Sequence, residues 1–218
     1  MKTTLLPLAL IAASSLTAPA LAYEKGDILV RVGVTQVSPD DSSSPVLVGG
    51  DASVLNTRLA VDSNAQLGLN VAYFFTDNIN VELLAATPFK HDVNLTANNA
   101  KLAEVTHLPP TVTVNYFFAE PSAVFQPYAG VGLNYTIFFD EEFTQANQDA
   151  LGVDDLELDA SFGLSAQVGF DYMFSDNLGL NASVRYIDIE TEATFNAGNV
   201  ETVTIDPMVY TLSLAYKF

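Results

Sequence analysis

Histidine and cysteine, the residues that most often bind zinc, are scarce in this 218-residue chain. The chain has no cysteine and two histidines, His91 and His107, so the ligands of a typical zinc site are missing. Both histidines flank a long polar segment, where we expect them to be exposed loop residues. Glu82 and Asp171 could act as an acid–base pair, but such a pair needs a cleft that admits substrate, and no pattern in the sequence indicates one. We therefore predict no catalytic site, no metal site and no cofactor.

Acidic side chains dominate the charge of the chain. There are 26 Asp and Glu residues against eight Lys and Arg, and the formal net charge is −18. This acidity argues against nucleic acid as a partner, since phosphates bind to clusters of Lys and Arg. Acidic runs at residues 140–142 and 154–155 could bind divalent cations through their oxygen atoms. Because their spacing matches no calcium loop, solvated loops beside cation-bridged lipopolysaccharide explain them equally well.

A two-residue alternation of apolar and polar side chains predicts that most of the chain forms long β-strands. The clearest case is segment 157–174, where one face is apolar and the other carries Gly, Ser, Gln and acidic residues. Successive side chains of a strand point to opposite faces, so this segment has one apolar and one polar wall. Seven other segments alternate in the same way: residues 26–37, 64–75, 79–90, 109–118, 126–139, 178–195 and 201–218.

The connections between these eight segments alternate in length. Short turns at one end and long loops at the other are typical of bacterial transmembrane barrels, which have an even number of strands. Aromatic residues collect beside the short turns, as expected of an interfacial girdle. The sequence therefore predicts an all-β fold, an eight-stranded antiparallel transmembrane β-barrel. The short turns are residues 76–78, 119–125 and 175–177, and the long polar connections are 38–63, 91–108 and 140–156.

A soluble barrel or sandwich would also alternate, but with its apolar face inside and a charged face outside. Here the polar face is rich in Gly, Ser and Asn, which suit the narrow lumen of an eight-stranded barrel. No apolar run after residue 22 approaches the roughly 18 residues that a membrane helix needs, whereas a barrel strand needs only about 9–11. These features favour the membrane-spanning form.

Residues 1–22 have the three-part layout of a secretory signal peptide. Lys2 gives a basic start, residues 5–16 are largely apolar, and Ala20-Leu21-Ala22 is a small-residue cleavage site. This layout predicts export, with residues 23–218 forming the barrel in the outer membrane of a Gram-negative cell, in contact with lipid and lipopolysaccharide. The terminal Phe218 ends an alternating strand and is similar to the signal read by the outer-membrane insertion machinery.

The direction of each strand also predicts what fills the lumen. Toward the short turns, inward positions carry both signs of charge, and we call this set the polar plug: Arg31, Glu82, Asp171, Arg185 and Lys217. Opposite charges inside a narrow barrel are expected to pair and fill it, leaving no open water channel.

Toward the long loops, the inward positions become apolar. They include Phe138, Ile187, Ile189, Ile205 and Val209. An apolar inner wall above the membrane, closed beneath by polar residues, predicts a hydrophobic cup. Simple packing beneath the loops explains the same residues equally well.

Several longer motifs resemble the outer-membrane protein W (OmpW) family, together with the alkane-import AlkL proteins. The resemblance covers almost the whole of residues 23–218 in order. The motifs are residues 87–92 (TPFKHD), 107–111 (HLPPT), 127–135 (PYAGVGLNY), 184–189 (VRYIDI), 205–207 (IDP) and 216–218 (YKF).

This resemblance implies an eight-stranded barrel with an apolar channel that extends above the bilayer. It also implies passive uptake of small hydrophobic molecules, which escape sideways through the barrel wall into the membrane. Family members often carry Trp near the lumen gate where this chain has Phe162, which places Phe162 on the substrate path, although the alternation places it outward unless a bulge intervenes. The alternative function is a structural or adhesive barrel with acidic interaction loops and an inert lumen.

Overall fold

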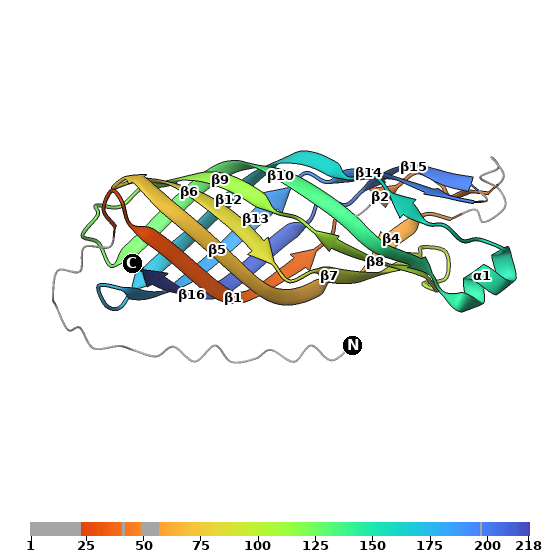
Figure 1. Cartoon of the computed structure of the whole chain (residues 1–218), viewed down its shortest axis with the longest axis horizontal. Coiled ribbons are helices and arrows are strands. Elements are labelled where there is room, and N and C mark those ends of the chain that lie inside the picture. Colours follow the sequence, from red (N-terminus) through yellow and green to blue (C-terminus); the bar gives the residue numbers. More distant parts are fainter. Residues whose placement is uncertain (1–22, 41, 49–56, 197) are drawn as a thin grey trace.

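The computed structural model describes residues 23–40, 42–48, 57–196 and 198–218, so the predicted signal peptide at residues 1–22 lies outside the described part. Figure 1 shows an elongated cylinder of tilted strands, with the carboxyl terminus at one end and helix α1 (Gln145–Leu151) at the other. The described residues include no helix that is long and apolar enough to cross a membrane.

In the described part of the chain, eight strands form one closed ring. Each strand pairs antiparallel with the next, and the last pairs with the first, so that Leu214 lies opposite Val32. The predicted eight-stranded antiparallel barrel is therefore confirmed. In ring order the strands are β1 (Ile28–Ser38), β5 (Asn64–Thr76), β6 (Ile79–Ala86), β9 (Thr111–Phe117), β10 (Phe125–Phe143), β12 (Ser161–Met173), β13 (Leu178–Ile187) and β16 (Met208–Lys217).

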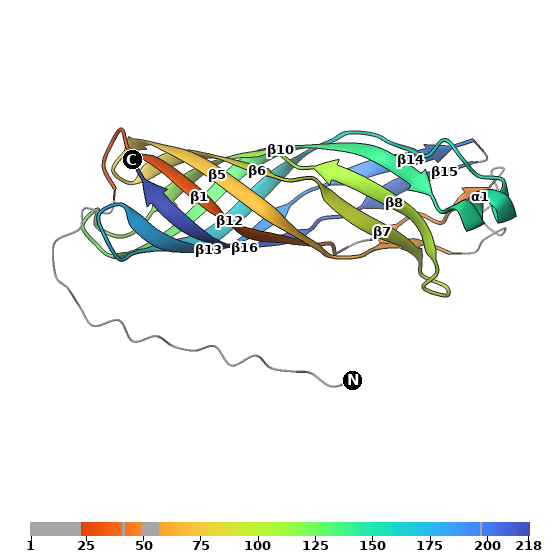
Figure 2. The same cartoon turned by 60° about the horizontal axis from the view of Figure 1, so that its bottom comes forward.

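Two smaller sheets continue the barrel beyond the long-loop end, as Figure 2 shows. The first joins β4 (Leu59–Val61), β7 (Phe89–Leu95) and β8 (Lys101–Leu108) to the upper part of β10. The second joins β11 (Glu157–Leu158), β14 (Glu190–Phe195), β15 (Gly198–Thr204) and β2 (Ser42–Ser43), with β3 (Leu47–Val48) paired to β15. We call these two sheets the extension.

The prediction of a polar loop for residues 91–108 was wrong, because this segment forms most of the β7–β8 hairpin. The hairpin reverses next to Asn99, whose φ of 56° lies in the left-handed region that Asn tolerates better than most residues. The other two long connections also contain regular structure. Strands β2, β3 and β4 lie in residues 38–63, while the end of β10 and helix α1 lie in residues 140–156.

Four of the predicted segments are interrupted where they pass from the barrel into the extension. Segment 79–90 breaks at Thr87 and Pro88, and segment 201–218 breaks around Pro207. Proline has no backbone N–H to donate to a neighbouring strand, so a regular ladder ends there. The remaining breaks fall at residues 159–160 and 188–189.

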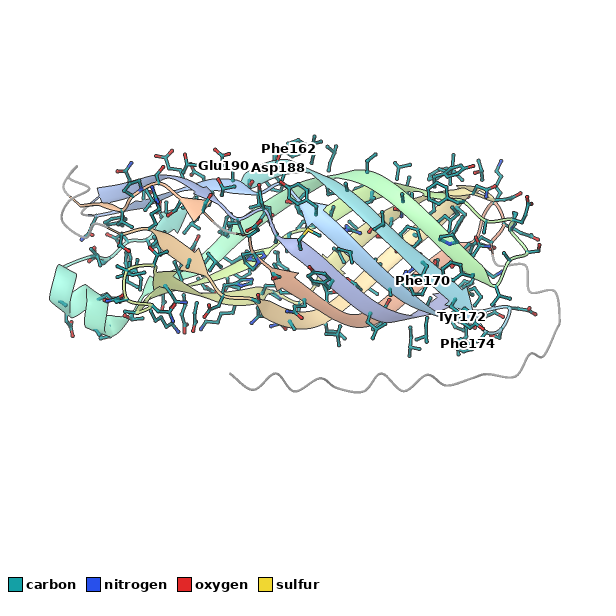
Figure 3. The ribbon with its side chains drawn as sticks, turned by 180° about the vertical axis from the view of Figure 1, so that it is seen from behind. Phe162, Phe170, Tyr172, Phe174, Asp188 and Glu190 are labelled. Carbon is teal, nitrogen blue, oxygen red and sulfur yellow. The ribbon has the colours of Figure 1, made fainter. Side chains whose placement is uncertain are left out.

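The outer surface of the ring is apolar and the lumen is polar, as a transmembrane barrel requires. Outward side chains such as Val34 and Leu212 are about 60% exposed, whereas the inward Thr35 and Asn181 are buried. Figure 3 shows Phe170, Tyr172 and Phe174 projecting outward at the short-turn end, as expected of an interfacial girdle.

Outward positions of the extension are different, since they carry Lys90, Asp92 and Glu104. Charged side chains of this kind do not face the hydrocarbon core, so the extension lies outside the membrane.

Candidate functional site

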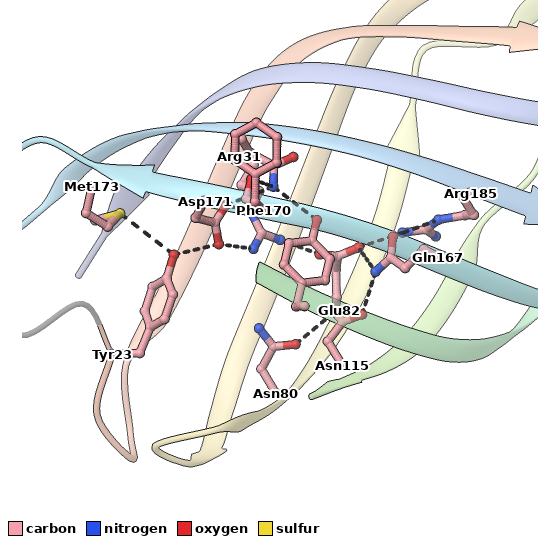
Figure 4. A network of polar contacts seen from close by, with 12 residues as sticks. Tyr23, Arg31, Asn80, Glu82, Asn115, Gln167, Phe170, Asp171, Met173 and Arg185 are labelled. Carbon is pink, nitrogen blue, oxygen red and sulfur yellow. Dashed lines mark hydrogen bonds and ion pairs between the residues drawn. The ribbon is translucent and has the colours of Figure 1, made fainter. Parts of the chain in front are cut away.

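A network of buried charges lies across the lumen in the half of the barrel nearer the short turns, which we call the lower half (Figure 4). Arg31 on β1 donates two hydrogen bonds to Asp171 on β12, from Nε to Oδ1 at 3.0 Å and from Nη2 to Oδ2 at 2.6 Å. Its remaining nitrogen, Nη1, is paired with Glu82 on β6. Arg31 therefore links three strands that are far apart in the sequence.

Glu82 also connects Arg31 to the second arginine of the lumen. Arg185 Nη2, on β13, lies 2.6 Å from Glu82 Oε1. Gln167 accepts from Arg185 Nε and Nη2, and its own amide nitrogen donates to Glu82 and to Asn115 Oδ1, the latter at 2.6 Å. The contacts thus continue from β13 through β12 to β9.

The four charged residues Arg31, Glu82, Asp171 and Arg185, which we call the lumen charge network, have a formal charge sum of zero and almost no exposed side-chain surface. Burial of a charge is costly unless it is paired and hydrogen-bonded, and here each charged residue has at least one such partner. Glu82 and Asp171 share Arg31 and are fully buried, so a substrate has no access to them as an acid–base pair.

Lys217 does not belong to this network, which corrects its place in the predicted polar plug. It lies near the end of β16, opposite Leu29, and its Nζ is 3.6 Å from Asp27 Oδ2. Both side chains are partly exposed, so this pair sits at the short-turn rim. The alternation gave the correct side of the strand but could not show that the long side chain reaches back to the rim.

An aromatic floor, which the alternation pattern did not predict, lies between the charge network and the short turns. It consists of Tyr23, Phe74, Phe117 and Tyr128, all at most 2% exposed. Tyr23 stacks on Phe74 with ring centroids 4.3 Å apart, and its hydroxyl donates to Asp171 Oδ2 at 2.6 Å. The Tyr128 ring lies 5.2 Å from the guanidinium carbon of Arg31.

The predicted apolar residues of the upper lumen lie together in one buried cluster that reaches from the top of the barrel into the extension: Phe138, Ile187, Ile189, Ile205 and Val209. Other residues of the same cluster line a cavity of about 60 Å³; of the five predicted residues, Phe138 and Ile205 line it and the other three do not. An apolar cavity of about 150 Å³ accommodates benzene. Side chains must therefore move before a whole solute of that size fits this apolar cavity.

Phe162 lies on the opposite side of the wall from this cavity, so its assignment to the substrate path was wrong. Its side chain is 68% exposed, and Figure 3 shows it on the outer surface. The ladder between β10 and β12 is regular at this height, with Phe162 directly opposite Tyr135. Since no bulge shifts the register, the alternation rather than the resemblance gave the right orientation.

His91 and His107 are buried in the extension, which corrects the expectation of exposed loop histidines. Each is at most 5% exposed, and the two rings stack with centroids 4.9 Å apart and planes inclined by 7°. Phe89 stacks on both, and the Phe138 ring lies at a tilt to His107, with ring centroids 5.9 Å apart. His91 alternates with the buried Phe89 and Val93, and His107 alternates with the buried Val105. This was a signal for burial that the polar neighbours obscured.

Burial also changes the titration of the two histidines. It lowers the pKa of His91, and it lowers the pKa of His107 to about 3, with a smaller contribution from the neighbouring His91. Asp62 and Asp92 raise the pKa of His91 but do not offset its burial. Both imidazoles are therefore uncharged at neutral pH.

We expect His107 to stay neutral between pH 4 and 8, which imidazole ¹⁵N shifts of the purified protein in micelles can measure. The unfolded chain takes up this proton near pH 6.5, so the free energy of unfolding should fall as the pH drops from 6.5 toward 3. The slope is about 1.4 kcal/mol per pH unit for this one group. A titration midpoint near 6.5 for folded His107 would contradict the burial described above.

Comparisons with known proteins agree with this architecture. Residues 24–218 match the model of the OmpW family. The chain is 48% identical to outer membrane protein W of Vibrio cholerae over the full length of both, and 26% identical to outer membrane protein AlkL of Ectopseudomonas oleovorans over 92% of this chain and 86% of that one. The crystal structure of the outer membrane protein OprG from Pseudomonas aeruginosa superposes with a TM-score of 0.84 at 39% identity, covering 91% of this chain and 98% of OprG.

Proposed function

Because the chain belongs to the OmpW family of Gram-negative outer-membrane β-barrels, we propose that it is a passive route by which small hydrophobic molecules cross the outer membrane. The observation that carries this proposal is the apolar cavity of the extension, which lies above a lumen filled by paired charges. The motif resemblance implies the same role, and kinship with AlkL supports it.

The lumen charge network supports an exit through the wall rather than along the barrel axis. An apolar solute that moved straight down would have to separate Arg31 and Arg185 from Glu82 and Asp171. Such a separation leaves buried charges without partners, at a cost of several kcal/mol. A solute that enters the extension is therefore expected to leave sideways, above this layer.

The interruption in backbone pairing where β6 passes into β7 and β8 passes into β9 is the best candidate for that exit. The β6–β9 ladder ends at the pair Leu84 and Thr111, and the β7–β8 ladder begins at Phe89 and His107. No backbone hydrogen bond joins residues 85–88 to residues 108–110 in the described part of the chain. Three of these residues are prolines, Pro88, Pro109 and Pro110, which lack the N–H needed to close the wall.

The same proposal includes the partners at the membrane. The acidic outer positions of the extension, such as Asp188 and Glu190, would face cation-bridged lipopolysaccharide (Figure 3). Phe218 is 69% exposed at the short-turn end, where the insertion machinery could bind it.

Uptake of a labelled alkane by intact cells tests the function. Cells without the protein should take up the alkane more slowly than cells that express it, and Ile187→Glu should reduce uptake to the same level, because it places a carboxylate in the apolar cluster. Ala103→Trp should act similarly without adding charge, because Ala103 lines the apolar cavity and a bulky ring there fills it.

Val131→Trp is the matched control for these variants, since Val131 is 68% exposed on the lipid-facing surface and the same ring there leaves the cavity unchanged. Each variant must show the gel mobility of a folded barrel before its uptake is compared. If uptake is equal in cells with and without the protein, the transport function is wrong.

A further inference from the structure

The apolar cavity has a single polar feature. Of the residues that line it in the described part of the chain, only His91 and His107 carry polar side chains. Both Nε2 atoms are buried and neither has a hydrogen-bond partner. A buried hydrogen-bonding atom without a partner is unfavourable, so a ligand that supplies one is favoured at this position.

The backbone fixes the hydrogen position on His91. Its Nδ1 is hydrogen-bonded to the backbone carbonyl oxygen of Asp62, and a carbonyl oxygen can only accept a hydrogen bond. Nδ1 therefore carries the hydrogen, and Nε2 of the neutral ring is left with a free lone pair. The unpartnered atom of His91 is an acceptor and requires a ligand group that donates.

The surroundings limit what that group can be. No Lys, Arg, Asp or Glu lines the cavity within the described residues, so neither a carboxylate nor an ammonium group would find a counter-charge. An isolated charge in such a site is far more costly to bury than a neutral hydroxyl. The lining thus suits an uncharged donor at the end of an apolar chain.

We propose that His91 and His107 form a head-group subsite that binds the hydroxyl of a neutral, alcohol-type amphiphile, whose alkyl chain occupies the apolar cavity once the side chains around it have moved apart. His91 Nε2 accepts from the hydroxyl, and the stacked His107 ring holds His91 in place and offers a second nitrogen to the same group. This proposal rests on the function proposed above. It names neutral alcohols of medium chain length as one class of solute that the protein carries.

Binding can be tested apart from transport on the purified protein in lipid nanodiscs. The probes are n-octanol and n-nonane, which have the same number of non-hydrogen atoms. We expect n-octanol to shift the ¹⁵N resonance of His91 Nε2 and n-nonane to leave it unchanged. If n-octanol shifts neither imidazole, the subsite is overturned whatever the transport result.

Uptake by whole cells gives the second readout. His91→Asn keeps a donor at the position of Nδ1, and hence the bond to Asp62, but removes the Nε2 acceptor. We expect octanol uptake to fall more than nonane uptake, so that the ratio of octanol to nonane uptake falls about fivefold, the effect of one lost hydrogen bond. His107→Phe should lower the ratio in the same direction while preserving a ring that can stack.

Phe138→Leu is the control, because it reshapes the cavity without changing a hydrogen-bonding group and should alter both uptake rates alike. An unchanged ratio in His91→Asn overturns the subsite while the transport function stands. If the wild-type protein accelerates neither probe, the transport function fails, and the shift of His91 by n-octanol alone then decides whether the subsite exists.

Discussion

Replacing Glu82 by Leu is expected to lower the free energy of unfolding of the barrel by about 3–5 kcal/mol. Glu82 is fully buried and is the carboxylate that Arg31 and Arg185 share. Leu has a similar size but leaves two guanidinium groups with Asp171 as their one carboxylate in the network. Urea unfolding in lipid vesicles, followed by circular dichroism because the chain has no Trp, measures the loss.

Glu104→Leu is the matched control for this prediction. Glu104 also contacts two basic residues, Lys90 and Lys101, but these side chains are all at least one-third exposed. Exposed ion pairs contribute about 1 kcal/mol or less, so this variant should be nearly as stable as the wild-type protein.

A double variant separates the lost charge pair from lost packing. Glu82→Leu combined with Arg185→Leu removes one charge of each sign and leaves the bidentate pair of Arg31 and Asp171 intact. We expect it to be more stable than Glu82→Leu alone, because no unpaired charge remains buried. Equal losses for Glu82→Leu and Glu104→Leu would contradict the importance of the network.

The alternation of side chains was enough to predict the barrel, because the membrane and the narrow lumen each demand a different residue type. The same rule placed Arg31, Glu82, Asp171 and Arg185 inward, and the structure brings them together. The alternation could not show which of these charged side chains contact one another, because those contacts depend on the stagger between strands that are distant in the sequence. Cleavage after Ala22 stays a prediction, because residues 1–22 lie outside the described part.

The extension was predicted less well, for a physical reason. Outside the membrane, outward positions are charged or polar, so the contrast between lipid and lumen disappears and residues 91–108 resemble a loop. His91 and His107 were misjudged for that reason, because histidine is common on surfaces and its burial here depends on contacts with Phe89 and Phe138. Tyr23 was missed because its position in the floor depends on a strand register that the sequence does not reveal.

An apolar solute is expected to occupy the extension and to leave above the lumen charge network. A photoreactive alkane, added to the protein in lipid vesicles and located by mass spectrometry, tests it most directly. We expect adducts on cavity residues such as Phe138, Ala103 and Ile205, and none on inward residues at or below the network, such as Asn115 or Leu29. Lipid-facing residues such as Val131 will be labelled from the membrane in either case. Adducts on Asn115 or Leu29 would show that solutes pass straight through the lumen and would contradict the account.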